Sequence, residues 1–325
     1  MIGAINCGYR TGISGNRHGD DMIIFVTGVG GQLGHDVMNT AIARGYTCVG
    51  SDITEEYDGI YDGSRVTTAP YVQLDITDKG AVMNVVAELK PDIIIHCAAW
   101  TAVDAAEDEK NRVRVHAINT LGTQYIAEAA KIIDAKMLYL STDYVFDGKG
   151  ERPWKPDDKH FAPLNYYGET KLLGEQAVSR TLAKYFIVRI AWVFGLNGKN
   201  FVKTMINVGK MNEKVFVVND QIGTPTYTLD LARLLIDMIE TEKYGYYHVT
   251  NEGGYISWYD FCVEFYKQYG LSTAVLPVTT DEYGFSKAAR PKNSRLDKSK
   301  LISAGFKPLP TWQDAVSRYL KEAQL

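Results

Sequence analysis

The 325-residue sequence has little of several features that mark specialised protein classes. Its four cysteines, at positions 7, 48, 97 and 262, form no Cys-x-x-Cys pair and have no histidines at a spacing that suits zinc. So few cysteines in so long a chain make a disulfide framework unlikely to be the basis of the fold, and we expect a reducing, cytoplasmic location. No apolar run approaches the roughly 20 residues of a membrane-spanning helix.

The charge balance is equally ordinary. The formal net charge is -4 and charged residues make up 23% of the chain, so the sequence indicates neither a nucleic acid nor a membrane surface as a partner. No metal-ligand spacing stands out, and we predict no metal site from the residues. The length allows one large domain or two smaller ones.

The first 21 residues differ from the rest of the chain. They are rich in Gly, Asn and Arg, lack an apolar central region, and precede a second methionine, Met22, where the first predicted strand begins. This pattern is not that of a secretory signal. We interpret residues 1–21 as a disordered or non-native extension outside the fold.

A strand that breaks into glycines stands near the start, Phe25-Val-Thr-Gly-Val-Gly-Gly-Gln-Leu-Gly34. The preceding run from Met22 is continuously apolar and predicts a buried parallel strand, and a helical pattern follows. Glycines at three-residue intervals suit a dinucleotide pyrophosphate, because they allow a tight turn, close approach of the backbone and close helix packing. The helix N-terminus adds free N–H groups. The predicted cofactor contacts are Gly28, Gly31, Gln32, Leu33 and Gly34.

Later strand ends supply further candidate cofactor contacts. Asp52 follows the glycines by about 20 positions, where a carboxylate accepts hydrogen bonds from the adenosine ribose and disfavours a 2′-phosphate. The alternative is an aspartate that caps a turn. Asp75 and Ile76 end the third predicted strand, where they would meet the adenine. The fourth ends in Ala98 and Ala99, whose small side chains let a cofactor pass over the sheet edge.

Strands and helices alternate along the first half, which predicts an α/β fold with a doubly wound parallel sheet of the Rossmann type. We expect a dinucleotide-binding domain over residues 22–190. Its predicted elements include a helix from about Lys79 to Leu89, a helix through Asn119 and Ala130, and strands at Lys136–Thr142 and Tyr185–Trp192. Beyond Gly195 the alternation becomes irregular. Residues 191–325 therefore predict a smaller, irregular α/β substrate domain, with a return to the sheet at about residues 226–250 and a loop-rich segment up to Ile302.

Tyr167 and Lys171 are spaced i, i+4 in a predicted helix, so their side chains share one face. A phenol titrates near 10, and a nearby ammonium lowers that pKa towards the working range of an acid or base. Taken alone, the pair reads more naturally as a surface pair on an amphipathic helix. Its position after a strand that ends in Ser141-Thr142 favours chemistry, since that hydroxyl lies at the carboxyl edge of the sheet.

Glycine turn, strand-end hydroxyl and Tyr/Lys helix, in this order, resemble the short-chain dehydrogenase/reductase superfamily, and the length resembles its extended branch. Further stretches are similar to the dTDP-4-dehydrorhamnose reductase family, and they span nearly everything after Met22. They are Cys97-Ala-Ala-Trp-Thr-Ala-Val-Asp104, Ser141-Thr-Asp-Tyr-Val-Phe-Asp-Gly148, Arg189-Ile-Ala-Trp-Val-Phe-Gly195, Val218-Asn-Asp-Gln-Ile-Gly-Thr-Pro-Thr226 and Ala289-Arg-Pro-Lys-Asn-Ser294.

The resemblance implies reduction of dTDP-4-dehydro-6-deoxy-L-mannose to dTDP-L-rhamnose, a step in the biosynthesis of cell-surface polysaccharides. It implies catalytic roles for three residues: Tyr167 protonates the C4 oxygen, Lys171 holds the nicotinamide ribose and tunes Tyr167, and Thr142 hydrogen-bonds the same oxygen. Residues that match the family's sugar pocket are Thr101, Val103, Tyr144 and Trp192; the alternative for Tyr144 and Trp192 is that they are ordinary core or rim aromatics. Lys203 and Arg290 are our choices for the thymidine diphosphate.

The resemblance leaves the cofactor and the assembly open. The family uses NADPH or NADH; family habit suggests NADPH, whereas Asp52 argues for NADH. Some members dimerise through a magnesium site made of surface glutamates, which nothing in this sequence indicates, so monomer and homodimer both stay open.

Two other functions remain alternatives. One is a nucleotide-sugar epimerase or dehydratase of the same superfamily, although Thr142-Asp143 is not followed by the Glu that a dehydratase would carry. The other is a non-catalytic, NADP-binding regulatory subunit that resembles the β subunit of methionine adenosyltransferase. The intact Thr142, Tyr167 and Lys171 favour an enzyme.

Overall fold

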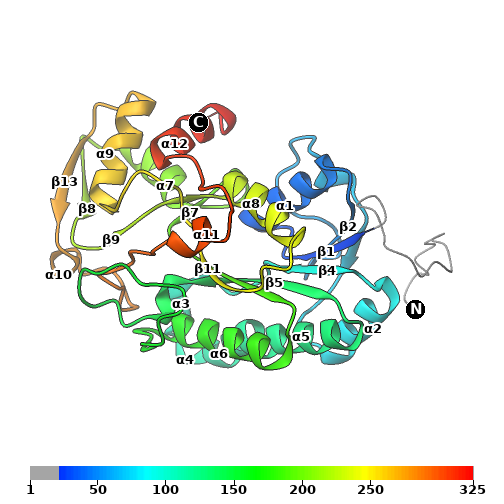
Figure 1. The fold of residues 1–325 in the computed structure, drawn as a ribbon. Helices are drawn as coiled ribbons and strands as arrows, with labels where there is room; N and C mark the ends of the chain where they lie inside the picture. Colours follow the sequence, from blue (N-terminus) through cyan, green and yellow to red (C-terminus); the bar gives the residue numbers. More distant parts are fainter. Residues whose placement is uncertain (1–21, 325) are drawn as a thin grey trace.

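Seven parallel strands form the centre of the molecule, in the order β11-β6-β5-β4-β1-β2-β3 (Figure 1). The computed structural model describes residues 22–324, so the predicted extension at residues 1–21 lies outside the described residues. Each strand of this sheet runs parallel to its neighbours, as the continuous apolar runs predicted. The chain leaves β1 in one direction and returns to pair β4 on its other side, which creates a switch point between them.

The strand bounds lie close to the predicted ones. One strand, Lys136–Thr142, has the predicted bounds, and another, predicted to reach Trp192, ends at Ile190. The chain returns to the sheet late, because β11 pairs with β6. The seven strands are β1 (Ile23–Thr27), β2 (Thr47–Asp52), β3 (Tyr71–Gln73), β4 (Ile93–His96), β5 (Lys136–Thr142), β6 (Tyr185–Ile190) and β11 (Gly245–His248).

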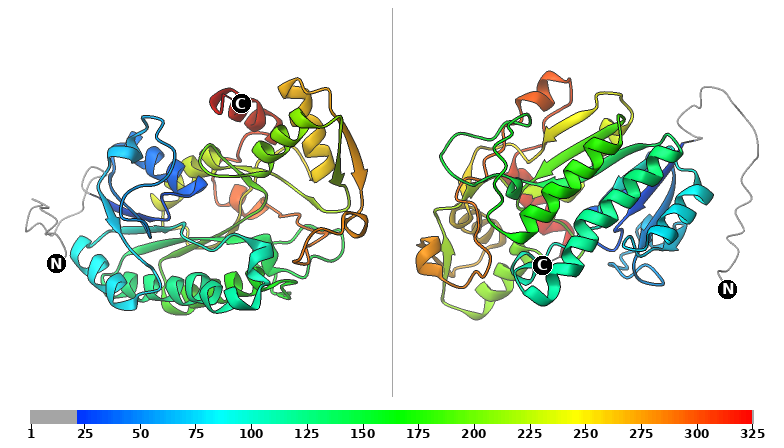
Figure 2. Two further views of the ribbon diagram at one scale, coloured as in Figure 1. Left: turned by 180° about the vertical axis from the view of Figure 1, so that it is seen from behind. Right: turned by 90° about the horizontal axis from the view of Figure 1, so that it is seen from below.

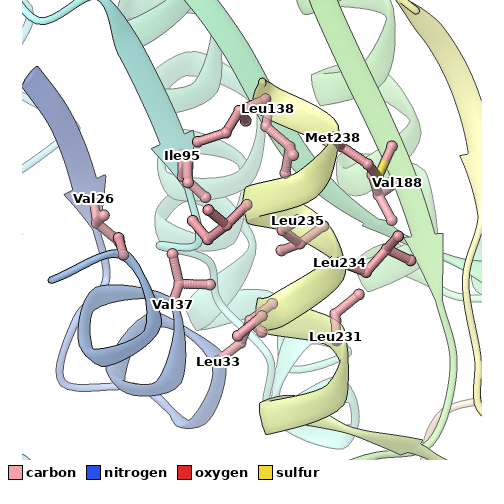
Figure 3. Close-up of a cluster of buried hydrophobic side chains, with 14 of the residues drawn as sticks. Val26, Leu33, Val37, Ile95, Leu138, Val188, Leu231, Leu234, Leu235 and Met238 are labelled. Atoms are coloured by element: carbon pink, nitrogen blue, oxygen red, sulfur yellow. The ribbon is translucent and has the colours of Figure 1, made fainter. Parts of the chain in front are cut away.

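Helices cover both faces of the sheet (Figures 1 and 2). One face carries α1 (Gln32–Ala43) and α8 (Thr228–Ile239), and the other carries α2 (Lys79–Leu89), α5 (Thr123–Ile132) and α6 (Tyr166–Thr181). Figure 3 shows Leu231, Leu234, Leu235 and Met238 of α8, from the later half of the chain, in one buried cluster with residues of α1 and of the sheet. The later half therefore helps to build the core of the sheet, and it is not a separate attachment.

The remaining elements form a smaller part beside the carboxyl edge of the sheet, with an aromatic core of its own. Its strands pair in twos: β7 (Val193–Phe194) with β10 (Thr226–Tyr227), β9 (Ile222–Gly223) with β12 (Ile256–Ser257), and β8 (Lys214–Val218) with β13 (Ala274–Val278). The last of these strands lies in the segment predicted to be loop-rich. The helices are α7 (Phe201–Met211), α9 (Trp258–Tyr269), α10 (Thr280–Tyr283), α11 (Ser299–Ser303) and α12 (Trp312–Glu322).

The single helix predicted through Asn119 and Ala130 is interrupted. After α3 (Val103–Ala106), the chain forms α4 (Glu109–His116), a π-helical stretch at Ala117–Gly122, and then α5. The Asn119 side chain accepts a hydrogen bond from Trp100 N at 2.8 Å and donates to Thr170 Oγ1 at 3.1 Å. These bonds join the π-helical stretch, the end of β4 and α6, so the irregular turn lies beside the carboxyl edge.

Residues 22–324 lack two features. No helix there is long and apolar enough to cross a membrane. No group of three or more His, Cys, Asp or Glu side chains in the same residues gathers as ligands for a metal ion.

Candidate active site

A cavity of about 600 Å³ lies at the carboxyl edge of the sheet. Open α/β sheets bind their ligands at this edge, near the switch point. The cavity brings together the residues predicted for catalysis, for the cofactor and for the sugar, but not Lys203 and Arg290, and the individual roles stay predictions. The residues brought together are Gly28, Gly31, Gln32, Leu33, Gly34, Asp52, Asp75, Ile76, Ala98, Ala99, Thr101, Val103, Thr142, Tyr144, Tyr167, Lys171 and Trp192.

The glycine turn joins β1 to α1 with no room for side chains at two positions. Gly28 has φ of +74°, and a Cβ atom there would lie 2.6 Å from Ala98 N. A Cβ atom on Gly34 would lie 2.1 Å from Gly28 O. Any larger residue at either position would therefore move the backbone that lines the cavity. The N-cap of α1, Gly31, makes no side-chain capping bond, so the first N–H groups of this helix are free for an anion.

Asp52, the last residue of β2, accepts hydrogen bonds from main-chain N–H groups and also lines the cavity. Its Oδ2 accepts a hydrogen bond from Gly30 N at 3.0 Å, and its Oδ1 accepts one from Ile53 N at 2.8 Å. The turn-capping role that we kept as an alternative is therefore present. The residue also lines the cavity, so the carboxylate is available to a ribose at the same time.

Tyr167 lies in the first turn of α6, which Asn165 caps by accepting a hydrogen bond from Gly168 N at 2.8 Å. Burial raises the pKa of Tyr167 above its usual range, Asp143 raises that pKa further, and a hydrogen bond with Thr142 lowers it. Lys171 is not among these causes. The expected lowering of the tyrosine pKa by the ammonium is thus wrong.

The contacts of the Lys171 ammonium group explain why it does not lower the pKa of Tyr167. Its Nζ donates to Leu140 O at 2.6 Å and lies 4.1 Å from the centre of the Tyr139 ring. Burial lowers the pKa of Lys171 to about 7, and the Glu175 carboxylate one turn further along α6 opposes this change. At neutral pH the group is therefore only part-charged, and its charge is directed at β5.

Thr142 connects the end of β5 to the next segment. Its hydroxyl oxygen accepts a hydrogen bond from Tyr144 N at 3.2 Å and donates to Asp143 Oδ1 at 3.1 Å. The Tyr144 ring packs edge-on against the Tyr167 ring, with centroids 5.8 Å apart. Thr142 and Tyr167 thus both line the cavity.

Comparison with known proteins decides the family. The family model described as "RmlD substrate binding domain" matches residues 22–325. A dTDP-4-dehydrorhamnose reductase of Streptomyces griseus is 41% identical over 261 residues, which cover 78% of this chain and 84% of that protein. The chain belongs to the dTDP-4-dehydrorhamnose reductase family.

Two further relatives span nearly the whole chain. The spore coat polysaccharide biosynthesis protein SpsK of Bacillus subtilis (strain 168) is 37% identical over 299 residues, covering 92% of this chain and 97% of SpsK. A crystal structure of dTDP-4-dehydrorhamnose reductase from Bacillus anthracis in complex with NADP is 38% identical, with a TM-score of 0.82. It covers 93% of this chain and 99% of the relative. The predicted family and the predicted Rossmann-type fold are both confirmed.

An aromatic pair that the sequence did not predict lies on the substrate side of this reductase-family cavity. Trp192 stacks on Trp258, the first residue of α9, with ring centroids 3.8 Å apart. Trp192 has φ of 53°, which is unusual for a large side chain, and both residues line the cavity. Trp258 follows a capping serine in an amphipathic helix, a signal that predicts the helix start but not a contact with a residue 66 positions earlier.

The basic residues that we chose for a diphosphate lie elsewhere. Lys203 donates to the carbonyl oxygens of Leu196 and Gly198. Arg290 makes a two-pronged ion pair with Asp104, at 3.0 and 2.9 Å. Neither lines the cavity, whereas Arg114 and Lys199 do. Apart from their charge, nothing in the sequence marks Arg114 and Lys199 as residues of the cavity, because their positions depend on long-range packing.

Proposed function

We propose that this protein reduces the C4 keto group of dTDP-4-dehydro-6-deoxy-L-mannose to dTDP-L-rhamnose, with NADPH or NADH as reductant. One observation carries the proposal: Thr142, Tyr167 and Lys171 line one cavity with the glycine turn, in a chain of this reductase family. Relatives bear the name of this reaction, and the Bacillus anthracis relative holds NADP. When bound, the nicotinamide supplies the hydride.

The glycine turn is the part of the chain that holds the cofactor's phosphates in this proposal. The main chain there is uncovered because Gly28 and Gly34 have no side chains, and the N-terminus of α1 is uncapped. Free N–H groups and the partial positive charge of a helix N-terminus suit a pyrophosphate. Asp52, at the end of β2, is the candidate partner of the adenosine ribose.

Tyr167 is the proton donor for the C4 oxygen in this mechanism. Because burial and Asp143 raise its pKa, the hydroxyl keeps its proton at neutral pH, which is the state that an acid needs. The Thr142 hydroxyl is a second donor towards the same oxygen. A preorganised donor of this kind lowers a barrier by about 3 kcal/mol as negative charge develops.

Lys171 is the candidate partner of the nicotinamide ribose, and the aromatic side of the cavity is the candidate sugar pocket. The Nζ of Lys171 is already held near the end of β5 by Leu140 O. The proposed sugar contacts are Thr101, Val103, Tyr144 and Trp192, all in the cavity wall. The monomeric or dimeric state and the cytoplasmic location stay predictions.

A coupled assay tests the proposed activity. The protein is mixed with dTDP-glucose, the two upstream biosynthetic enzymes and either NADPH or NADH, and the absorbance of the reduced nicotinamide is followed. We expect oxidation that depends on the sugar nucleotide. Absence of oxidation with both cofactors would contradict the reductase and leave the regulatory-subunit alternative.

Two tyrosine variants separate the proposed acid from its neighbour. Tyr167→Phe should lower kcat at least about 100-fold, because it removes the general acid, while nicotinamide binding measured by fluorescence persists. Tyr166→Phe is the matched control, since the Tyr166 hydroxyl donates to Arg112 O at 3.4 Å and lies outside the cavity lining. Full activity of Tyr167→Phe would show that another group donates the proton.

A further inference from the structure

Lys199 is a cation of the cavity wall to which the proposed mechanism gives no role. The side chain is exposed, and its Nζ makes no hydrogen bond or ion pair with any residue from 22 to 324. Lys171, in the same wall, differs because it is buried and donates to Leu140 O at 2.6 Å. An ammonium group that has no partner within the protein is available to an anionic ligand in the cavity.

The main chain around Lys199 is fixed against the glycine turn. Asn197 donates to a carbonyl oxygen of that turn at 2.8 Å, and Asn200 donates to Gln32 Oε1 at 3.2 Å. Gly198 lies beside the same glutamine, since a Cβ atom on it would be 3.6 Å from Gln32 Cγ. Residues on both sides of Lys199 therefore contact the turn or the first residue of α1.

The loop between β7 and α7 does not need the Lys199 side chain for its shape. Lys203 of α7 donates to the carbonyl oxygens of Leu196 and Gly198. Asn200 donates to the carbonyl oxygen of the residue after β7 at 2.8 Å. These bonds come from other side chains, so the loop positions Lys199 without using its ammonium group. A substitution of Lys199 should therefore leave the fold unchanged.

The start of α1 is the part of the cavity that suits a pyrophosphate. Gly31 leaves the first N–H groups of this 12-residue helix without a side-chain cap. Ser51 lies beside the turn, because its carbonyl oxygen accepts from Gly28 N at 2.7 Å. Its hydroxyl oxygen is buried and has no hydrogen-bond partner within the described residues. Free donors and an unpaired hydroxyl at one place indicate a polar ligand there.

The start of α7, next to Lys199, is less suited to an anion. Asn200 caps that helix by accepting a hydrogen bond from Lys203 N at 3.0 Å. The two helix starts therefore differ, because one has a side-chain cap and the other has none. This difference favours the cofactor's pyrophosphate at α1, rather than the diphosphate of the sugar nucleotide, as the partner of Lys199.

We propose that the Lys199 ammonium group binds the pyrophosphate of the nicotinamide cofactor. The inference deepens the proposed function and rests on it for the identity of the ligand. The cofactor would then be held by main-chain N–H groups of the first half of the chain and by a cation of the later half. Lys199 raises the affinity for the cofactor and takes no part in proton or hydride transfer.

Titration of the protein with NADPH and with NADH, followed by nicotinamide fluorescence, tests this contact without a sugar substrate. In Lys199→Met both dissociation constants should rise at least about 10-fold, because a charge-assisted contact to a phosphate is lost. ADP-ribose, which has the pyrophosphate but no nicotinamide, should lose affinity equally in a calorimetric titration. Adenosine has no phosphate, so its dissociation constant should change less than about twofold.

Two further variants and the salt dependence are the controls. Lys199→Arg keeps the charge and should bind both cofactors within about threefold of the wild type. Lys210→Met removes the same charge from an exposed site in the last turn of α7, outside the cavity lining, and should change affinity less than about twofold. Added salt should weaken cofactor binding more in the wild type than in Lys199→Met, since ions screen an exposed charge.

Several results would overturn the proposal. Unchanged cofactor affinity in Lys199→Met, or an equal loss for adenosine, would show that Lys199 does not contact the pyrophosphate. An equal loss in Lys210→Met would show an effect of net charge alone. A rise confined to the KM of the sugar nucleotide would assign Lys199 to the substrate instead. Failure of the proposed function is distinguishable, since the wild type would then oxidise no nicotinamide while Lys199→Met still weakened cofactor binding.

Discussion

Lys171 carries an ammonium group into the interior of the protein, where it lies between Leu140 O and the Tyr139 ring. Burial lowers its pKa from 10.5 in the unfolded chain to about 7. Between these two values the unfolded state binds more protons than the folded state, so the contribution of Lys171 to stability rises with pH. At pH 7 and below, folding has to overcome nearly the full cost of burying the charge.

The variant Lys171→Met should therefore be more stable and inactive. At pH 7 we expect the free energy of unfolding in urea to rise by about 1 kcal/mol or more, because the buried charge is removed. At pH 10 the gain should largely vanish, while reductase activity is lost at both values. Lys79→Met is the control, since the exposed Lys79 should change stability by less than about 0.5 kcal/mol. If the stability of Lys171→Met relative to the wild type were lower at pH 7 than at pH 10, the predicted direction of the pH dependence would be wrong.

Asp52 allows a test of cofactor choice. Its carboxylate at the end of β2 would repel a 2′-phosphate by about 1 kcal/mol or more, so we expect kcat/KM to favour NADH over NADPH. Asp52→Asn should reduce that preference about 10-fold. Asp58→Asn, a nearby exposed acid outside the cavity lining, should leave it unchanged. An unaltered ratio in Asp52→Asn would mean that Asp52 serves the turn alone, through its bond from Gly30 N.

At the scale of elements, the turn between β1 and α1 leaves no room for a methyl group at Gly34. A Cβ atom on Gly34 has no room beside Gly28 O, whereas Gly80 lies exposed in α2, and a Cβ atom there would lie 3.3 Å from Asp78 Oδ1. We expect Gly34→Ala to lower the free energy of unfolding by about 2 kcal/mol and to weaken nicotinamide binding at least about 10-fold. Thermal unfolding and cofactor titration measure both effects.

Gly80→Ala is the matched control for this substitution. Alanine favours a helix over glycine by about 0.5 to 1 kcal/mol, so this variant should be as stable as the wild type or more stable. Equal effects of the two substitutions would show that the turn adapts to a methyl group.

Elements with a clear periodic pattern were predictable, and those set by distant contacts were not. The helix Lys79–Leu89 and the strand Lys136–Thr142 have their predicted bounds, because apolar spacing and local capping determine them. The π-helical stretch was missed, since it depends on bonds from Asn119 to Trp100 and Thr170. Helix propensity is a property of the local sequence and does not predict hydrogen bonds between distant residues.

The same division applies to the cavity. The predicted residues line it because parallel strand ends meet at one edge, which alternation alone implies, and because the family motifs mark the sugar side. Trp258 and Lys199 reach the cavity from the later half of the chain. The order of elements there is irregular, so it did not predict which residues face the cavity. Arg290 was chosen for its charge, and charge did not reveal that Asp104 already holds it.

At the scale of the whole molecule, two asparagines join the later half of the chain to the glycine turn. Asn197 donates through Nδ2 to Gly30 O at 2.8 Å and to Gly31 O at 3.3 Å, and accepts from Ile60 N at 3.0 Å. Asn200 caps α7 and donates to Gln32 Oε1 at 3.2 Å. The segment between β7 and α7 is thus fixed to the entrance of α1, so the two parts of the cavity wall hold each other.

Asn197→Ala should loosen that link. Loss of these buried bonds should lower the free energy of unfolding by about 1 to 3 kcal/mol and weaken nicotinamide binding several-fold, because the turn loses a support. Asn212→Ala is the control: its amide donates to Val208 O at 2.7 Å within α7, and its removal should change stability but not binding. Calorimetric titration separates the two, and equal affinities would show that the turn keeps its shape alone.

The atoms that Asn197 recognises have a consequence for how this protein can diversify. Its partners in the turn are the main-chain carbonyl oxygens of Gly30 and Gly31, which every amino acid carries. The bonds from Asn197 are therefore independent of side-chain identity at residues 30 and 31, whereas the bond from Asn200 depends on the side chain of Gln32. Substitutions at residues 30 and 31 that alter cofactor choice can keep the Asn197 link to the substrate half, so part of the joint leaves the two specificities free to evolve separately.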